Sequence, residues 1–521
     1  MSLILPDKMA YRPRFRSNGW PLLLPTLLLL LWQFAAVNAW VAPQILPAPA
    51  VVMETALTLL HNDLLAQWAG SLAQLSLGLL AGVVAGTLLG ALFALSSTAA
   101  RLTEPLFYAL AQIPTLGWIP LFMVLFGIDN GLKLAVIVKT AIVPVALNTR
   151  QAVASVPLTL SEAARTMNLS RWQRLRWLVI PASLPGWFTG LRLAFSQAWV
   201  SLVVVELLAS SSGIGYLMVW GRQLFQLDIV FVAIAVVGLS GLLMEWGIAR
   251  LYARWINWPQ PAAERLSYSP QSGWRAWLLP AILLVLWQLG SQQGWVNIML
   301  FSSPLAVAQR LIQGTVSGEL PTAMLASFSR AFVGALLGIG IGLACGLWLA
   351  LRPRAGQVAV PTLNALRHIA LFAWLPLLTA WVGNDDGGKI VFIALAAFFP
   401  IFFSTLQAVG QRNPQLDEVA AMLRISGLTR LRKLILPGAA SGIFAGLRLA
   451  LMFAWPGAIG AEYFMSSGSG IGSLMINAQQ LLDMPTLFCG MGLIGLTGAA
   501  LEKAGRALES RATRWRQQEQ L

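Results

Sequence analysis

Charged side chains are scarce in this sequence. Only 11% of the 521 residues are Asp, Glu, Lys or Arg, while 57% are hydrophobic and the mean hydropathy is +0.71. Apolar runs of about 18 residues or more, the length that a helix needs to cross a bilayer, recur along the chain. This composition excludes a soluble globular domain. The roughly ten-residue alternation of a membrane β-barrel is also missing. The sequence therefore predicts an all-α polytopic protein whose surroundings are the lipid bilayer.

Cysteine and histidine are nearly absent, with two of each. Cys345 and Cys489 both lie inside apolar runs, which predicts small core residues rather than a disulfide or a metal pair. The sequence contains no metal-ligand spacing, no nucleophile elbow and no paired carboxylates. We therefore predict no catalytic residue, no metal site and no enzyme activity in this chain.

The net charge is +15, which by itself would suggest a nucleic-acid partner. The basic residues, however, concentrate in alternate loops between the apolar runs, as the positive-inside rule requires. We therefore predict no nucleic-acid binding. The same rule predicts a multi-pass membrane protein with both termini and both arginine-rich loops on the cytoplasmic side.

The sequence contains a long internal repeat. An arginine-rich island at residues 161–185 returns 256 residues later at 417–441, and in each copy a glutamate stands 19 residues before a proline. Each half is predicted to hold six spans, so the halves form a parallel repeat with a pathway between them. We predict a first transmembrane domain at 1–258, a linker at 259–273 and a second transmembrane domain at 274–521.

Twelve spans are expected in total. The first 40 residues look like a signal peptide, but the same segment recurs in the second half, so we predict a retained membrane helix. Two short amphipathic helices, near 51–65 and 305–315, are predicted on the outer surface, either to contact a soluble partner or to cap the bundle. The spans are expected near 20–41, 70–97, 104–126, 131–154, 183–210 and 228–250, then 275–295, 325–351, 359–382, 388–410, 439–466 and 484–503.

The second span of each half carries glycine at every fourth position. This small-xxx-small spacing lets helix backbones approach closely, so it predicts a packing face rather than a ligand site. The glycines are Gly78, Gly82, Gly86 and Gly90 in the first half, and Gly334, Gly338, Gly342 and Gly346 in the second.

The repeated island resembles the E-A-A loop of the inner-membrane permeases of bacterial ATP-binding-cassette (ABC) importers. The motif stands as Glu162-Ala163-Ala164 in the first half and Glu418-Val419-Ala420 in the second. Span-three and span-five landmarks at 113–121 and 190–199, each echoed in the second half, are similar to the nitrate/sulfonate/taurine/bicarbonate branch. The resemblance implies a type I importer permease fold, here as two fused permease domains in one chain.

The resemblance also implies partners. Two ABC ATPase subunits would dock on the cytoplasmic loops, and a periplasmic solute-binding protein would deliver the solute. Residues 383–390 nearly match a phosphate-binding loop, but Ile390 lacks the hydroxyl that ligates Mg²⁺ and two aspartates would repel phosphate. ATP and Mg²⁺ are therefore expected on the partner subunits, with no cofactor in this chain.

The ATPase-docking residues implied by the resemblance lie on two short helices joined by a turn in each island. The family's glycine in this turn is replaced by Asn168 in one half and Arg424 in the other; asparagine tolerates a left-handed turn, arginine much less so. The predicted docking set is Glu162, Ala163, Ala164, Met167, Asn168, Glu418, Val419, Ala420, Leu423 and Arg424.

Two carboxylates, Glu206 and Glu462, occupy equivalent positions near the outer end of span five. An intramembrane carboxylate suggests a pathway or gating role, but capping of the following Ser/Gly-rich turn is an alternative. Glu245 is expected to snorkel or to pair with Arg250, and His368 to pack or hydrogen-bond. The candidate pathway or gate residues are Trp118, Trp199, Glu206, Trp374, Trp455 and Glu462.

The function predicted from these features is the permease component of an ATP-driven, binding-protein-dependent importer of a small solute. Nitrate, bicarbonate, a sulfonate such as taurine and a heterocyclic vitamin precursor are all compatible solutes. A twelve-helix secondary transporter that does not use ATP is the alternative, but it leaves the repeated island unexplained.

Overall fold

The computed structural model describes residues 20–256, 258, 277–295, 297, 300–411, 414–425, 427–465 and 468–512. This part of the chain contains helices, turns and loops and no β-strand. The predicted linker at 259–273 lies outside the described residues.

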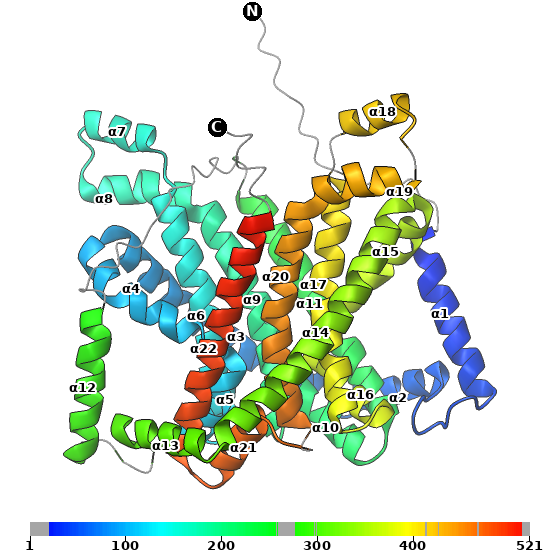
Figure 1. Cartoon of the computed structure of the whole chain (residues 1–521), viewed down its shortest axis with the longest axis horizontal. Helices are drawn as coiled ribbons and strands as arrows, with labels where there is room; N and C mark the ends of the chain where they lie inside the picture. Colours follow the sequence, from blue (N-terminus) through cyan, green and yellow to red (C-terminus); the bar gives the residue numbers. More distant parts are fainter. Residues whose placement is uncertain are drawn as a thin grey trace, which may run out of the picture.

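The first half runs from α1 to α11 (Figure 1). Its helices are α1 (Trp20–Val37), α2 (Pro49–His61), α3 (Leu64–Leu95), α4 (Ser97–Ala111), α5 (Thr115–Phe126), α6 (Asn130–Ala154), α7 (Leu158–Thr166), α8 (Arg171–Arg174), the π-turn η1 (Leu175–Val179), α9 (Ile180–Ala209), α10 (Ile214–Gln223) and α11 (Leu227–Trp255).

The second half repeats this order. Its helices are α12 (Leu278–Gln292), α13 (Pro304–Val316), α14 (Glu319–Leu351), α15 (Pro353–Arg367), the 3₁₀ turn η3 (Leu371–Trp374), α16 (Leu375–Trp381), α17 (Asp386–Gly410), α18 (Pro414–Met422), α19 (Gly427–Arg430), the π-turn η4 (Leu431–Ile435), α20 (Leu436–Phe464), α21 (Ile471–Gln480) and α22 (Met484–Ala512).

Eight helical segments of the described chain are long and apolar enough to cross a membrane. Two further pairs, α4 with α5 and α15 with α16, would each make one span but bend by 94° at the break. The shorter apolar helices α1 and α12 stand where the first span of each half was predicted. The prediction of an all-α, two-half membrane fold is confirmed. The predicted third span of each half is therefore broken by a sharp bend.

In the first half, this break has a local cause. Pro114 precedes α5 and has no backbone N–H to continue the hydrogen-bond ladder from α4. The short inner helix α5 then turns into the bundle and packs on α20, α21 and α22 of the other half. The second half makes the equivalent contacts with the first: η3 packs on α9 and α11, and α16 packs on α10 and α11. The bent spans therefore form much of the contact between the halves.

The glycine rows pack as predicted. All eight glycines are buried, and they hold α3 against α6 and α14 against α17. A Cβ on Gly90 would lie 2.4 Å from the carbonyl oxygen of Ala146, and one on Gly338 would lie 2.2 Å from that of Ala394. Only glycine permits these backbone approaches.

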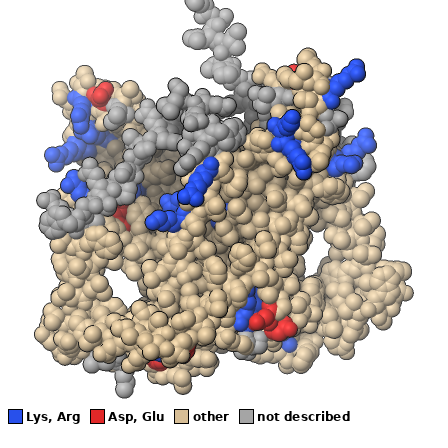
Figure 2. All heavy atoms as spheres, viewed as in Figure 1, with Lys and Arg blue, Asp and Glu red and all other residues tan. Residues whose placement is uncertain are grey.

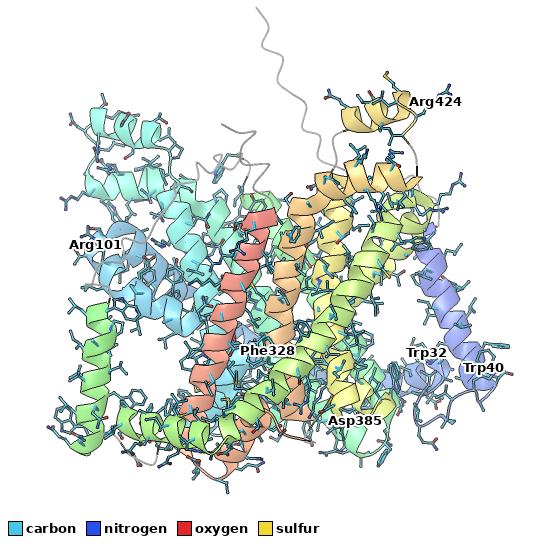
Figure 3. The ribbon with its side chains drawn as sticks, viewed as in Figure 1. Trp32, Trp40, Arg101, Phe328, Asp385 and Arg424 are labelled. Carbon is cyan, nitrogen blue, oxygen red and sulfur yellow. The ribbon has the colours of Figure 1, made fainter. Side chains whose placement is uncertain are left out.

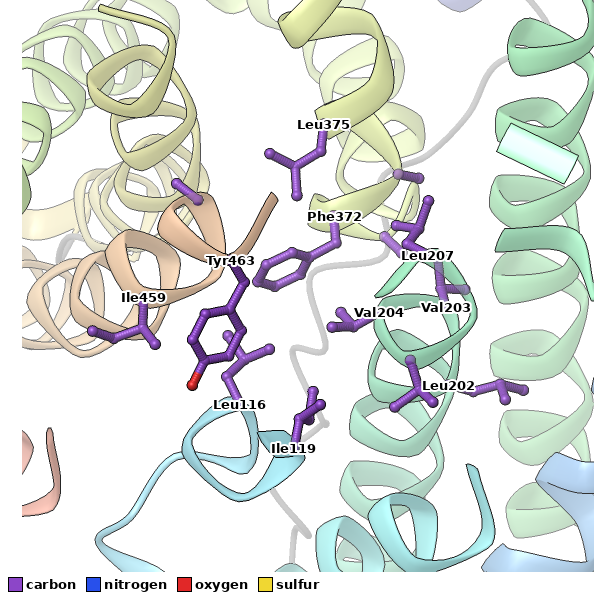
Figure 4. Close-up of a cluster of buried hydrophobic side chains, with 14 of the residues drawn as sticks. Leu116, Ile119, Leu202, Val203, Val204, Leu207, Phe372, Leu375, Ile459 and Tyr463 are labelled. Atoms are coloured by element: carbon purple, nitrogen blue, oxygen red, sulfur yellow. The ribbon is translucent and has the colours of Figure 1, made fainter. Parts of the chain in front are cut away.

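The first helix of each half touches its own half and also packs on the other half. Helix α1 lies along α15, and α12 lies along α4, at opposite sides of the molecule (Figure 1). Between the halves, an apolar cluster joins α5 and α9 to η3, α16 and α20 (Figure 4). Its members include Leu116 and Ile119, which meet Phe372 and Tyr463 from the second half.

Candidate functional site

The two predicted docking islands form helix pairs that project from the same end of the bundle (Figure 1). Helices α7 and α8 make one pair, and α18 and α19 make the other. The α8 end is fixed by a capping box in which Ser170 Oγ accepts from Gln173 N and Gln173 returns a bond to Ser170 N. The turn that leads into α8 is therefore well capped.

The turn between the helices is left-handed in both copies. Asn168 has φ 51° and Arg424 has φ 49°, although neither is glycine. The same backbone bond closes each turn, from Leu169 N to Ala164 O at 3.1 Å and from Ile425 N to Ala420 O at 2.9 Å. The family's turn geometry thus survives without its glycine, and strain is concentrated at Arg424 because a Cβ disfavours this conformation.

Arg424→Gly is expected to stabilise the second docking loop by about 1 kcal/mol, because it removes the Cβ from a left-handed residue. Amide exchange at Ile425, whose N–H closes the turn, should slow about fivefold. Arg424→Ala is the control, since it removes the same guanidinium but keeps the Cβ. Equal slowing in both variants would show that charge, not backbone strain, limits this turn.

The structure divides the predicted docking residues into two groups. Met167 and Leu423 are 72% and 66% exposed, and Val419 is 50% exposed. Glu162, Ala163, Asn168, Glu418 and Arg424 are also exposed. Ala164 and Ala420 are buried, at 5% and 4% exposed. The second small residue of each pair is therefore covered within this chain, and its place in a docking surface stays a prediction.

Each docking pair continues directly into the fifth span. The helix runs from α8 through the π-turn η1 into α9, and from α19 through η4 into α20. One π-turn sits at the equivalent place in each half, and such insertions occur frequently at functional sites. The projecting pair and the far end of the span therefore belong to one continuous helical segment.

The far end of α9 carries Glu206, which is 1% exposed. Ser71 Oγ of α3 donates to Glu206 Oε1 at 2.6 Å, and the backbone N–H of Gly215 donates to Oε2 at 2.9 Å. Lys133 of α6 donates to the carbonyl oxygen of Ser212 at 2.9 Å in the same turn. We call this arrangement the first outer clasp.

A Cβ on Gly213, which has φ +107°, would lie 2.1 Å from Glu206 Oε1. The Gly-rich turn is therefore needed to close the backbone over the carboxylate.

The second outer clasp surrounds Glu462, which is 2% exposed. Ser327 Oγ and Gly472 N donate to it at 2.7 Å and 2.8 Å, as their counterparts do in the first half. Arg330 adds an ion pair to Glu462 Oε1 at 2.8 Å and another to Asp386 at 2.8 Å. The geometry matches the capping alternative for both carboxylates.

The first half replaces the Arg330–Asp386 ion pair with a neutral one. Gln74 and Asn130 stand 256 positions before Arg330 and Asp386, and Gln74 Nε2 donates to Asn130 Oδ1 at 3.0 Å. Together the two exchanges remove one positive and one negative charge, so the two clasps keep the same charge balance. The two residues therefore change together.

The loop before α6 makes one more contact with the turn after α9. Asp129 accepts from Ser211 N at 2.7 Å and from Ser210 Oγ at 3.1 Å. The backbone N–H of Ser211 holds the pKa of Asp129 below its ordinary value, so this carboxyl is ionised at neutral pH. In the second half, Asp385 instead caps α17 by accepting from Gly388 N at 3.2 Å.

The four predicted tryptophans fall into two groups, one buried and one partly buried. Trp199 and Trp455 are 4% and 1% exposed, and their indole N–H groups donate to Val237 O at 3.3 Å and Ile494 O at 3.1 Å. These hydrogen bonds hold span five against span six within each half. Trp118 and Trp374 stand on the bent spans at the boundary between the halves and are only partly buried.

Glu245 has different partners from those predicted. It pairs with Arg192 on α9, and His368 Nδ1 of the second half lies 3.0 Å from Glu245 Oε2. Arg250 instead stacks on Trp246, with its guanidinium 4.9 Å from the ring centroid. The cluster joins the two halves, and Gln112 holds the position equivalent to His368.

Sequence reasoning missed three lysines in the fourth spans. Lys133 and Lys139 lie on α6 and Lys389 lies on α17, all within segments apolar enough to cross the membrane. A lysine inside such a segment was itself a readable signal, because intramembrane charges are expensive and are kept for a reason.

These features define a class of protein: a helical membrane transport subunit with two equivalent halves, each carrying an outer clasp and a projecting helix pair joined by one long span. The model of the binding-protein-dependent transport system inner membrane component family matches twice, at residues 78–257 and 338–508. The chain belongs to this family and carries its domain twice, which confirms the resemblance found in the sequence.

Curated relatives match one half at a time. The aliphatic sulfonates transport permease protein SsuC of Bacillus subtilis is 33% identical over 262 residues, which are 50% of this chain and 95% of the relative. The taurine transport system permease protein TauC of Escherichia coli is 31% identical over 237 residues, 44% of this chain and 86% of the relative. The nitrate import permease protein NrtB of Leptolyngbya laminosa is 33% identical over 179 residues, 34% of this chain and 64% of the relative.

Proposed function

We propose that this chain is the complete membrane-spanning pathway of an ATP-driven importer, with both permease halves in one polypeptide. Two ABC ATPase subunits dock on the α7–α8 and α18–α19 pairs, and a solute-binding protein delivers the solute at the opposite end. The solute is a small oxyanion, and the names of the relatives favour a sulfonate, taurine or nitrate over a neutral nutrient.

The observation that carries this proposal is the exposed apolar surface on the projecting helices. Met167, Val419, Met422 and Leu423 present large side chains to the surroundings at the end of the bundle where helices leave the spans. Apolar side chains on a short helix are the anchors of helix-in-groove binding. The continuous helix from each pair to its clasp supplies the route by which closure of the ATPases moves the outer end.

The distribution of charge supports a cytoplasmic position for the docking end. Basic atoms gather around α7, α8, α18 and α19 in Figure 2, and Figure 3 shows Arg424 at this end and Asp385 at the opposite one. Arginine-rich loops remain on the cytoplasmic side during insertion. ATP and Mg²⁺ are then bound by the partner subunits, and this chain supplies the pathway and no hydrolytic chemistry.

The docking surface is tested by Met167→Glu together with Leu423→Glu. A buried anchor at an interface is worth about 2 kcal/mol or more, so the apparent affinity for the ATPase should fall at least about 30-fold in co-purification and titration. ATP-driven uptake into proteoliposomes should fall with it, while the thermal unfolding temperature stays unchanged because both side chains are exposed.

Leu481→Glu is the matched control. Leu481 is 80% exposed but follows α21, at the other end of the bundle, so ATPase binding should be unaffected. A double variant that binds the ATPase and transports like the unmodified chain would contradict the proposed docking surface. Uptake that persists without any ATPase would contradict the proposed function as a whole.

A further inference from the structure

A polar cluster surrounds Lys139 at the break between α4 and α5. Lys139 Nζ donates to the carbonyl oxygen of Ile113 at 3.0 Å and to Thr115 Oγ1 at 3.3 Å. Thr140 Oγ1 lies 3.2 Å from Thr115 Oγ1 and 3.3 Å from Ser201 Oγ. The cluster thus links the first residue of the inner half-span to α6 and α9.

Lys139 has no acidic partner among the described residues. Its contacts are the two oxygen atoms above and the ring of Trp118, whose centroid lies 5.8 Å from Nζ. Lys133 and Lys389, by contrast, stand beside the carboxylates of the two outer clasps. An ammonium group without a counter-ion is costly in a membrane-spanning helix, so its presence calls for a ligand of opposite charge.

A second donor lies on the same wall. The indole N–H of Trp118 is buried and has no hydrogen-bond partner in the part of the chain that the structure describes. An orphaned donor is as unfavourable as a missing hydrogen bond and is satisfied when a ligand brings an acceptor. Neither the ammonium group nor the indole N–H has a negatively charged acceptor. An oxyanion could accept a hydrogen bond from each of them.

The cluster occurs only in the first half. The positions 256 residues after Thr115, Lys139, Thr140 and Ser201 hold Leu371, Leu395, Ala396 and Gly457. Every polar side chain is replaced by an apolar one or by hydrogen. The polar face of the first half therefore has no equivalent in the second.

The cluster also lies beside the boundary between the halves. Helix α5 packs on α20, α21 and α22 of the second half, and Leu116, the residue after Thr115, belongs to the apolar cluster that closes the boundary. An anion that passes this closure toward the start of α5 would next meet Lys139 of α6.

We propose that Lys139, with Thr115 and Trp118, forms a binding station for a singly charged oxyanion, a sulfonate or nitrate group, on the inner side of the apolar closure. As a station for the transported solute, it rests on the proposed function. The second half is apolar at the equivalent positions and adds no second positive charge. The anion is therefore held from one side only and can be released.

The test uses the full chain in nanodiscs, without ATPase or solute-binding protein. Thermal unfolding is followed while nitrate or methanesulfonate replaces chloride at constant ionic strength. The unmodified chain should show a saturable rise in its unfolding temperature, because a ligand that binds only the folded state stabilises it. In Lys139→Leu, which installs the residue of the second half, the concentration for half effect should rise at least tenfold.

The same variant separates binding from a structural role. If Lys139 serves only to tie α6 to the α4–α5 break, Lys139→Leu lowers the unfolding temperature in chloride, whereas removal of an unpaired charge raises it. Lys503→Leu is the control for net charge, since Lys503 is exposed near the end of α22, and its anion response should be that of the unmodified chain.

An anion response that is absent from the unmodified chain, or unchanged in Lys139→Leu, overturns the station. A station that binds nitrate or methanesulfonate while ATP-driven uptake of both fails would instead contradict the proposed solute, so the two failures are distinguishable.

Discussion

Arg330→Gln is expected to destabilise the second half by about 3–5 kcal/mol, which is the usual cost of removing one partner from a buried ion pair. Arg330 is 6% exposed and bridges Glu462, Asp386 and the carbonyl oxygen of Ser469, with the last contact at 2.6 Å. Without the guanidinium, Glu462 and Asp386 share only Lys389. The loss should appear as a lower unfolding temperature and a poor yield of monodisperse protein in detergent.

Adding Asp386→Asn should recover part of this loss. The double variant recreates the Gln74–Asn130 pair of the first half, in which Lys133 alone stands near the clasp glutamate. A coupling free energy of about 2 kcal/mol between the two substitutions is expected from a double-mutant cycle. If the double variant is no more stable than Arg330→Gln, the two halves do not use interchangeable clasps.

Gly338→Leu is expected to prevent normal packing of α14 on α17, at a cost of at least about 3 kcal/mol. Even a single Cβ at this position would lie 2.2 Å from the carbonyl oxygen of Ala394 and 2.9 Å from Ala397 Cβ. The nearest atom belongs to backbone, so relief requires the helices to separate. Size-exclusion profiles and thermal unfolding should both report the loss.

Gly340→Leu provides a control two residues away on the same helix. A Cβ there meets nothing within 4 Å, so the substitution adds an apolar side chain to an open face. It should leave the unfolding temperature within a degree or two, by the small effect typical of surface substitutions. Equal damage from both variants would mean that the close approach of α14 to α17 is not what makes Gly338 intolerant of a side chain.

Sequence reasoning predicted the features that depend on a residue pattern within one segment of the chain. Apolar length, loop charge, the repeat and the four-residue glycine spacing each follow from a single segment and the solvent around it. The bend between α15 and α16 was not predictable in this way, because no proline stands in the break at His368–Ala370, whereas Pro114 marks its counterpart.

The features that sequence reasoning missed depend on neighbours far apart in the chain. Glu245 meets His368 of the other half, and Arg330 meets Glu462, 132 residues away. Ala163 and Ala164 are identical in type, yet one is exposed and the other packs inward, because one residue turns a helix by about 100°. The roles of Lys133 and Lys139 likewise required knowing which oxygen atoms the fold brings to each amine.

Because both halves belong to one polypeptide, their sequences need not be identical. In a permease assembled from two copies of one subunit, every side chain at the central boundary faces or accompanies its twin, and a lone ammonium there would become a repelling pair. Here Lys139 and Arg330 each occur once, opposite Leu395 and Gln74 in the repeat. One gene can therefore encode a proposed pathway with a polar side that binds the anion and an apolar side that does not. Each side can be changed by mutation without changing the other.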